Sequence, residues 1–299
     1  MKKRFYAKKR KNSNKYINIF IFIVFFIIAF SYVYTRLNIT ISDEVIVSYI
    51  LNNNEDEFNF GNLTSAEFLL NYTFNSNYNF DSLVFNETKP ENKSDPLVYI
   101  YNTHPTEYYA ATNYEIFNVT PTVITASYML KEYLSDYSIP SIVEQRSVTD
   151  ILTLNAWSYA YSYDASRIYL EEIIKEYPSI KYFVDLHRDA ASKEATTTQI
   201  DGESCIKFMF VVGAEYSGYE ENLELANLVN SKLININKDF SRGVIKKEGT
   251  GVNGIYNQDL SGNLILIEAG AQYNTIDEVN CGMKYISEVL AEVILSEGE

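Results

Sequence analysis

The 299-residue sequence has few cysteines, histidines, glycines and prolines, and its net charge is −14. Neither of the two cysteines belongs to a CxxC pair, so a cysteine zinc site and a disulfide framework are both excluded. The sequence is compatible with one disulfide between Cys205 and Cys281 and equally with two buried thiols. With only 12 Gly and 6 Pro, the chain is neither collagen-like nor of low complexity.

The shortage of positive charge is uneven along the chain. Residues 1–36 hold nine of the 25 Lys and Arg residues and no Asp or Glu, which leaves 16 basic residues against 39 acidic ones after Arg36. Nucleic-acid binding needs a clustered basic face, and this acidic body lacks the composition for one. We therefore expect no nucleic-acid partner.

One long apolar run extends from Ile17 to Tyr34, interrupted only by Asn18 and Ser31. Its length, at about 1.5 Å per residue, is roughly 27 Å, close to the thickness of a bilayer core. Eight basic residues precede the run and one follows it, so the positive-inside rule predicts a cytoplasmic N-terminus and an extracytoplasmic remainder. A cleaved signal peptide is the alternative, but Ala29-Phe-Ser-Tyr matches an A-x-A-like cleavage site poorly. A single-pass cell-membrane protein is the favoured interpretation.

The rest of the chain divides by composition. We expect a basic cytoplasmic tail at 1–16, a transmembrane anchor at 17–35, a stalk or small accessory segment at 36–95, and one folded domain at 96–299. Within this domain, strand and helix patterns alternate. Strands are predicted at 97–101, 182–186, 205–212 and 264–267, and helices from an N-cap at Thr120 with Pro121 first, over 157–177, over 220–236, and from a capping box at Thr275–Glu278. This alternation indicates an α/β fold with a mainly parallel sheet covered by helices on both faces.

Residue types that bind metals follow three of these strands. His104 and Glu107 follow the first at H-x-x-E spacing, His187 follows the second, and Glu268 follows the last. Active sites of parallel sheets form beyond the carboxyl ends of strands. Catalytic zinc commonly takes three protein ligands, often two His and one Glu, while a further carboxylate serves as general base. We predict His104, Glu107 and His187 as Zn²⁺ ligands and Glu268 as the base.

Simpler interpretations compete with this one. A single histidine after a strand is more often structural, and H-x-x-E occurs by chance, but this chain has only two histidines and both follow predicted strands. Glu268 is alternatively a helix-end charge or a partner of a ligand. Arg188 is predicted to stabilise an oxyanion, or to pair with Asp189 instead. Three other carboxylates compete for the third ligand position: Glu115, Glu144 and Asp185.

Three stretches give the chain a family resemblance. They are Tyr99-Ile-Tyr-Asn-Thr-His-Pro-Thr-Glu-Tyr108, Val184-Asp-Leu-His-Arg-Asp-Ala190, and Tyr256-Asn-Gln-Asp-Leu-Ser261 running into Ile265-Leu-Ile-Glu-Ala-Gly270. In these residues and in their order, residues 97–298 resemble the stage II sporulation protein P family of cell-wall hydrolases. The chain has Asn102 where relatives often have a further histidine.

The resemblance implies a function and a fold. It implies a zinc-dependent N-acetylmuramoyl-L-alanine amidase of peptidoglycan, with a zinc-amidase-like mixed sheet flanked by helices and a catalytic amidase domain at 96–299. It also implies action during engulfment in sporulation beside stage II sporulation proteins D and M, with cleavage of peptide cross-links reported for relatives. His104, Glu107, His187 and Glu268 match the positions that such amidases use.

Two other functions fit the same residues. One is a metallocarboxypeptidase of the H-x-x-E…H type, which an arginine clamp for a free carboxylate would distinguish. The other is a membrane-anchored cell-wall-binding module without enzymatic activity, which the metal content of the purified protein would distinguish.

Overall fold

The computed structural model describes residues 95–110 and 120–296. The predicted tail and anchor, nearly all of the predicted stalk, and Glu115 lie outside these ranges. Within them, no helix combines the length and apolar character that a membrane crossing requires.

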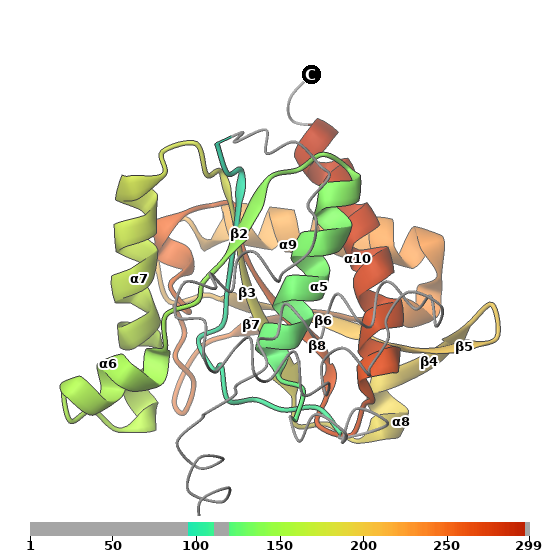
Figure 1. The fold of residues 1–299 in the computed structure, drawn as a ribbon, viewed down its shortest axis with the longest axis horizontal. Coiled ribbons are helices and arrows are strands. Elements are labelled where there is room, and N and C mark those ends of the chain that lie inside the picture. Colours follow the sequence, from blue (N-terminus) through green and yellow to red (C-terminus); the bar gives the residue numbers. More distant parts are fainter. Residues whose placement is uncertain (1–94, 111–119, 297–299) are drawn as a thin grey trace, which may run out of the picture. The chain divides into compact units, whose positions relative to one another are not determined.

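A six-stranded sheet lies at the centre of the described chain, in the order β2-β1-β3-β8-β6-β7 (Figure 1). Its strands are β1 (Val98–Tyr101), β2 (Ser141–Val143), β3 (Tyr182–Asp189), β6 (Phe208–Gly213), β7 (Ser241–Lys247) and β8 (Leu264–Ala271). The first four in spatial order are parallel, β6 runs antiparallel to β8, and β7 is parallel to β6. The predicted mixed, mainly parallel sheet is therefore confirmed. A separate antiparallel pair consists of β4 (Thr197–Ile200) and β5 (Glu203–Ile206).

Helices flank this sheet, as predicted. They are α5 (Val123–Asp136), α6 (Val148–Leu154), α7 (Ser162–Glu176), α8 (Lys193–Thr196), α9 (Tyr219–Ile236) and α10 (Ile276–Ser296), with 3₁₀ turns η3 (Tyr159–Tyr161), η4 (Lys238–Phe240) and η5 (Gln258–Leu260). Tyr99 and Tyr101 pack with Leu170 of α7 on one face of the sheet. Helices α5 and α10 contact each other and lie on the opposite side from α7 (Figure 1). Successive side chains of a strand point to opposite faces of the sheet, so β1 contributes core residues to the helical layers on both faces.

The first helix of the domain begins later than predicted. Its N-cap is Thr122 rather than Thr120, because Thr122 accepts from the backbone N of Ile124 while its own N donates to Thr125 Oγ1. Tyr108 forms an isolated antiparallel bridge with Thr122. Pairing with a distant segment therefore holds residues 120–122 extended, which local capping signals do not reveal.

Other boundaries also moved. The helix predicted from residue 157 starts at Ser162, after the turn η3, because Trp157 packs instead against the small core that α6 shares with α7. The strand predicted at 205–212 is two strands, since β5 pairs with β4 while β6 joins the main sheet. The sequence missed β2, β4, β7, α6 and α8, whose runs are short or only partly buried. Helix α9 agrees closely with its prediction.

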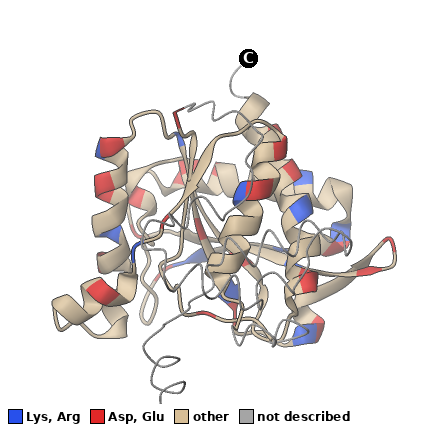
Figure 2. Ribbon diagram, in the orientation of Figure 1, with Lys and Arg blue, Asp and Glu red and all other residues tan. Residues whose placement is uncertain are grey.

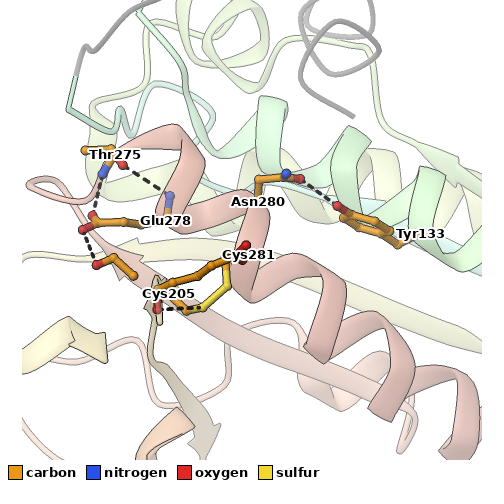
Figure 3. Close-up of a disulfide and its surroundings, with 8 residues drawn as sticks. Tyr133, Cys205, Thr275, Glu278, Asn280 and Cys281 are labelled. Atoms are coloured by element: carbon orange, nitrogen blue, oxygen red, sulfur yellow. Dashed lines mark hydrogen bonds between the residues drawn. A yellow bond between two sulfur atoms is a disulfide. The ribbon is translucent and has the colours of Figure 1, made fainter. Parts of the chain in front are cut away.

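Cys205 of β5 and Cys281 of α10 form a disulfide (Figure 3). This settles the pairing that the sequence left open. The bond fastens the β4–β5 pair to the C-terminal helix. Near it, Tyr133 of α5 donates to Asn280 of α10 at 3.0 Å, which joins the two helices of this layer.

The predicted capping box at the start of α10 is confirmed. Thr275 N donates to Glu278 Oε2 at 2.8 Å, and Glu278 N donates to Thr275 Oγ1 at 3.3 Å (Figure 3). The same carboxylate accepts from Ser204 of β5 and pairs with Lys193 of α8 at 3.0 Å. This cap therefore also holds the β4–β5 pair and α8 against α10.

Candidate functional site

The predicted site residues converge at one edge of the sheet. Strands β1, β3 and β8 are adjacent and parallel, so their carboxyl ends meet there. His187 and Glu268 are direct partners in the β3–β8 register. After β1 the chain turns so that Glu107 N donates to His104 O at 3.1 Å, and the rings of His104 and His187 lie 5.2 Å apart. His187 and Glu268 lie within their strands rather than beyond them, because both strands are longer than predicted.

A bulge in β8 follows Glu268. His187 pairs with Glu268, but Asp189 pairs with Ala271, so β8 holds one extra residue in this interval. Gly270 occupies it with φ +66°, and an added Cβ would meet the side chain of Ile206 at 2.6 Å. Bulges bend strands and redirect side chains beside active sites. The Glu-Ala-Gly sequence here fits that backbone requirement.

His187 lies between two carboxylates. Its Nδ1 is 3.6 Å from Glu107 Oε2, and its Nε2 is 3.0 Å from Asp185 Oδ1, an ion-pair distance without an aligned hydrogen bond. Burial alone would lower the pKa of His187, but Asp185 and Glu107 raise it well above its ordinary value. For Glu107, burial alone would raise the pKa. His187, the backbone N of Arg188 and His104 outweigh burial, so the pKa of Glu107 is lowered.

Three buried polar atoms of the predicted site residues have no hydrogen-bond partner: Nδ1 of His104, Nε2 of His187 and Oε2 of Glu268. Burial raises the pKa of Glu268 to about 7, and the nearby carboxylates Glu107, Asp189 and Asp185 add to the rise, while His187 opposes it. Burial, and then His187, lower the pKa of His104. Unpaired buried polar atoms are costly, so they mark groups kept for a ligand or a proton.

The residues fit a metal ion in their chemistry. Imidazole nitrogens and a carboxylate are the usual protein ligands of catalytic zinc, and two tetrahedral ligands at about 2.0–2.2 Å lie roughly 3.3–3.6 Å apart. The 3.6 Å between His187 Nδ1 and Glu107 Oε2 agrees with that separation. Across residues 95–110 and 120–296, however, no three His, Cys, Asp or Glu side chains group closely enough to hold a metal. His187 and Glu107 thus lie at a separation that two metal ligands would have, and the His104 ring lies beside His187.

Tyrosines that the sequence did not single out surround the histidines. Tyr159 stacks on His104 with ring centres 4.8 Å apart, and Tyr163 packs edge-on to His104 at 5.5 Å and stacks on His187 at 6.3 Å. Burial, with Asp185 and Glu268 nearby, raises the pKa of Tyr163 well above its ordinary value, so it stays a neutral phenol. The Tyr-rich run over η3 and the start of α7 carries no ligand spacing, and only the fold reveals these ring contacts.

Arg188 lies beside the site and is held by backbone groups. Its Nε donates to Tyr108 O at 3.1 Å and its Nη1 to Asp189 O at 3.3 Å, while its backbone N donates to Glu107 Oε2 at 3.0 Å. The Asp189 carboxylate pairs with Arg242 at 2.6 Å. The anticipated alternative of an Arg188–Asp189 carboxylate pair is therefore not what the fold forms.

Two of the competing carboxylates have other positions. Glu144 bonds to Tyr99 at 2.5 Å and to Arg146 at 2.7 Å, and it belongs to an ion-pair group with Glu172 on α7. Figure 2 shows that basic and acidic residues are interspersed on α5, α7 and α10. Asp185 faces Nε2 of His187, whereas Glu107 faces Nδ1 on the other side of the ring. Asp185 therefore does not join His187 Nδ1 and Glu107 as a third candidate ligand.

Asn102, where relatives often have histidine, joins β1 to β3. Its Nδ2 donates to Leu186 O at 2.6 Å, and its Oδ1 accepts from Ser127 at 3.0 Å. It is buried and stands immediately behind the strand end that carries the candidate ligands. Its contacts give it a structural place between β1, β3 and α5.

Comparison with known proteins gives one family. The model of the stage II sporulation protein P (SpoIIP) family matches residues 48–291. The stage II sporulation protein P of Bacillus subtilis (strain 168) is 30% identical over 203 residues, covering 66% of this chain and 51% of that protein. The chain thus spans about half the length of this curated relative.

Solved structures share partial likeness. The N-acetylmuramoyl-L-alanine amidase AmiC2 of Nostoc punctiforme aligns with a TM-score of 0.38 and 14% identity, over 68% of this chain and 97% of that one. The CwlD amidase from Clostridioides difficile, in complex with the GerS lipoprotein, aligns with a TM-score of 0.41 and 13% identity, over 67% and 99%. A metallo-carboxypeptidase from Burkholderia cenocepacia aligns with a TM-score of 0.39 and 10% identity, over 70% and 60%.

Proposed function

Because this chain belongs to the stage II sporulation protein P family, we propose that it is a peptidoglycan hydrolase of sporulation that cleaves the N-acetylmuramoyl-L-alanine amide bond with the help of Zn²⁺. The observation that carries the proposal is the convergence of His104, Glu107, His187 and Glu268 at one sheet edge. A zinc-amidase-like fold is part of the proposal. Cleavage of peptide cross-links is a further activity that the family resemblance suggests.

His104, Glu107 and His187 would hold the metal. When bound, Zn²⁺ supplies Lewis-acid chemistry, polarising the scissile carbonyl and lowering the pKa of the attacking water. The unpartnered Nδ1 of His104 and the Glu107–His187 separation support this assignment.

Glu268 is the proposed general base. Its carboxylate takes a proton from the attacking water and delivers it to the leaving amine of L-alanine. A base works best when its pKa lies near the working pH, and burial brings the pKa of Glu268 to about 7. The absence of a partner on Oε2 leaves that oxygen able to accept the proton.

Arg188 is the proposed stabiliser of negative charge on the carbonyl oxygen. A guanidinium carries five N–H donors, and the bonds to Tyr108 O and Asp189 O engage only some of them. Those two bonds also fix the cation next to Glu107, whose carboxylate accepts from the backbone of the same residue.

We assign the protein to the cell membrane, anchored by residues 17–35, with its N-terminus in the cytoplasm and the catalytic domain of residues 96–299 outside. Two observations support this orientation: the basic tail before the apolar run, and the Cys205–Cys281 disulfide, since disulfides persist in oxidising compartments. Its partners would be peptidoglycan, the membrane and, by family resemblance, stage II sporulation proteins D and M.

Digestion of purified peptidoglycan by the full-length chain in detergent, with mass spectrometry of the products, tests the function. Amidase activity releases peptides with a free N-terminal L-alanine and leaves glycan strands intact, and a metal chelator should stop it. Release of single C-terminal amino acids would identify a metallocarboxypeptidase instead. Binding to peptidoglycan without any product, by chain loaded with zinc, would identify a non-enzymatic binding module.

A further inference from the structure

A line of buried polar side chains lies behind His187. The Asp185 carboxylate, 3.0 Å from His187 Nε2, accepts twice from Thr103: from the backbone N at 3.0 Å and from Oγ1 at 2.7 Å. Ser166 Oγ is 2.9 Å from Thr103 Oγ1, and Asn257 Nδ2 donates to Ser166 Oγ at 3.1 Å. The line joins β3, the segment after β1, helix α7 and the segment before η5.

Three members of this line belong to the three stretches that carry the family resemblance: Thr103, Asp185 and Asn257. The proposed reaction uses none of them. Thr103 and Asp185 are 0% exposed and Asn257 is 4% exposed, so a substrate arriving from solvent does not meet them. Asn257 also adopts φ +59°, a left-handed conformation that Asn tolerates better than most residues. Their role must therefore run through a neighbour.

The donors in the line point toward Asp185. Thr103 has a single hydroxyl hydrogen and gives it to Asp185, so Ser166 is the donor to Thr103, sharing its hydrogen with Tyr163 O at 3.2 Å. Asn257 can donate only from its amide nitrogen. An ionised carboxylate accepts only, and burying one without such donors is expensive. The two hydrogen bonds from Thr103 therefore fix the Asp185 carboxylate beside the His187 ring.

The two ring nitrogens of His187 face different carboxylates. Nε2 lies 3.0 Å from Asp185 Oδ1, an ion-pair distance without an aligned hydrogen bond, and Nδ1 lies 3.6 Å from Glu107 Oε2. If Nδ1 bound a metal, the hydrogen of the ring would lie on Nε2, where the Asp185 carboxylate is the neighbouring acceptor. A carboxylate beside the second nitrogen is the usual partner of a metal-binding histidine.

We propose that Asp185, held by Thr103, Ser166 and Asn257, is a positioning residue that fixes the tautomer and ring orientation of His187 and presents Nδ1 to the metal. Asp185 acts through His187 and does not itself bind the metal. The line also ties the metal position to the three motif segments, which come from distant parts of the chain. The inference rests on the zinc chemistry of the proposed function.

The test uses variants of the untagged full-length chain in detergent. Asp185→Asn keeps the size but replaces one acceptor oxygen with a donor. Thr103→Val removes the hydroxyl and keeps the shape, whereas Thr103→Ser keeps the hydroxyl. Ser287→Ala is the control, because it removes an equally buried hydroxyl within α10, away from this line.

Zinc affinity, measured by competition with a chromophoric chelator, is expected to fall about 10- to 100-fold in Asp185→Asn and about tenfold in Thr103→Val. Thr103→Ser and Ser287→Ala should stay within about twofold of wild type. Nitrogen-15 NMR of the imidazole rings adds a direct view, since the chain has only two histidines. The His187 Nε2–H signal should appear in wild type and Thr103→Ser and be lost or shifted in Asp185→Asn.

Wild-type zinc affinity with an unchanged Nε2–H signal in Asp185→Asn would overturn the inference. So would equal affinities for Thr103→Val and Thr103→Ser, since the hydroxyl would then be merely structural. If zinc binding follows the expected pattern but peptidoglycan stays intact, the proposed function fails and this inference stands. A wild-type chain that binds no zinc would overturn both.

Discussion

At the residue scale, two glutamates of the site have opposite surroundings. Glu107 accepts from the backbone of Arg188 and lies beside His187, and its pKa is lowered. Glu268 has an oxygen without a partner, and burial raises its pKa to about 7. When two carboxyl groups in one site have pKa values shifted in opposite directions, the one with the lowered pKa suits a charged role and the one with the raised pKa suits proton transfer. The first two predictions follow from this difference.

Glu268→Gln should fold, keep its zinc and lose about 10²-fold or more of its amidase rate, because the amide keeps the size but cannot accept the proton. Glu107→Gln, its matched partner, should weaken zinc binding instead. Zinc content and amidase rate of both variants provide the measurement. A near wild-type rate for Glu268→Gln would make Glu268 structural, and loss of zinc from that variant alone would exchange the two roles.

The wild-type chain should bind about one zinc, and His187→Ala should lose most of it, because the sequence holds no third histidine to substitute. Elemental analysis after dialysis measures the content. Glu144→Gln is the control, since this carboxylate pairs with Arg146 away from the site. Stoichiometric zinc in the double variant His104→Ala, His187→Ala would contradict the ligand assignment.

At the scale of elements, α10 is fastened at its start and along its side. The Glu278 cap bonds to Thr275 and Ser204, and the Cys205–Cys281 disulfide joins the same helix to β5. These contacts come from segments far apart in the sequence, so the helix links the β4–β5 pair to the main layer. Its stability should depend on both pH and redox state.

Glu278→Gln should lower the free energy of unfolding at pH 7 by about 1–2 kcal/mol, since bonds to the charged carboxylate are lost. Burial raises the pKa of Glu278, but Thr275, Asn274, Lys193 and Ser204 together lower it below 4.5. A lowered folded pKa means that this stabilisation is present above pH 4.5 and is lost as the pH falls through the folded value. Urea unfolding from pH 7 to pH 3 should therefore converge for wild type and variant. Exposed Glu288→Gln on the same helix is the control, and an equal difference at both ends of the range would refute the linkage.

Replacing both Cys205 and Cys281 with Ala should cost about 2–4 kcal/mol of unfolding free energy, because the bond closes a long loop in the unfolded chain. The two cysteines are 76 positions apart. Urea unfolding with and without reductant provides the measurement: reductant should destabilise wild type and leave the double variant unchanged. Alkylation of two free thiols in protein isolated under oxidising conditions would contradict the pairing.

At the scale of the whole molecule, the proposed topology places the basic N-terminal tail and the acidic body on opposite sides of a membrane. Residues 1–36 carry nine basic residues and no acidic ones. Anchoring at 17–35 would hold the proposed hydrolase close to the bilayer and facing the wall. This orientation leads to the last prediction.

A reporter fused after Glu299 should be active only outside the cytoplasm, because the positive-inside rule retains the basic tail within. The mature protein should keep its own N-terminus and fractionate with membranes. Activity of a cytoplasm-dependent reporter at the same position would reverse the topology. Recovery of a soluble protein that begins near residue 32 would show a cleaved signal peptide.

The sequence alone identified the residues that gather at the site, for a local reason. Buried parallel strands are continuous apolar runs, so β1, β3 and β8 could be found by composition, and His104, His187 and Glu268 by their places at the ends of those runs. The capping box of α10 is equally local, since its two members are three residues apart. Local patterns fix which stretches become strands or helices and which side chains follow them.

Only the tertiary structure decided what depends on distant partners. Thr122 rather than Thr120 caps α5 because Tyr108 pairs with it, and only the pairing of β6 with β8 defines the direction of β6 as antiparallel. The same is true of Asp185, which the sequence pattern could present only as a possible metal ligand. In the folded chain, its carboxylate accepts from Thr103 and lies beside the ring of His187. Spacing along the chain specifies side-chain faces over a few residues, whereas hydrogen-bond partners drawn from positions tens of residues away exist only once the chain has folded.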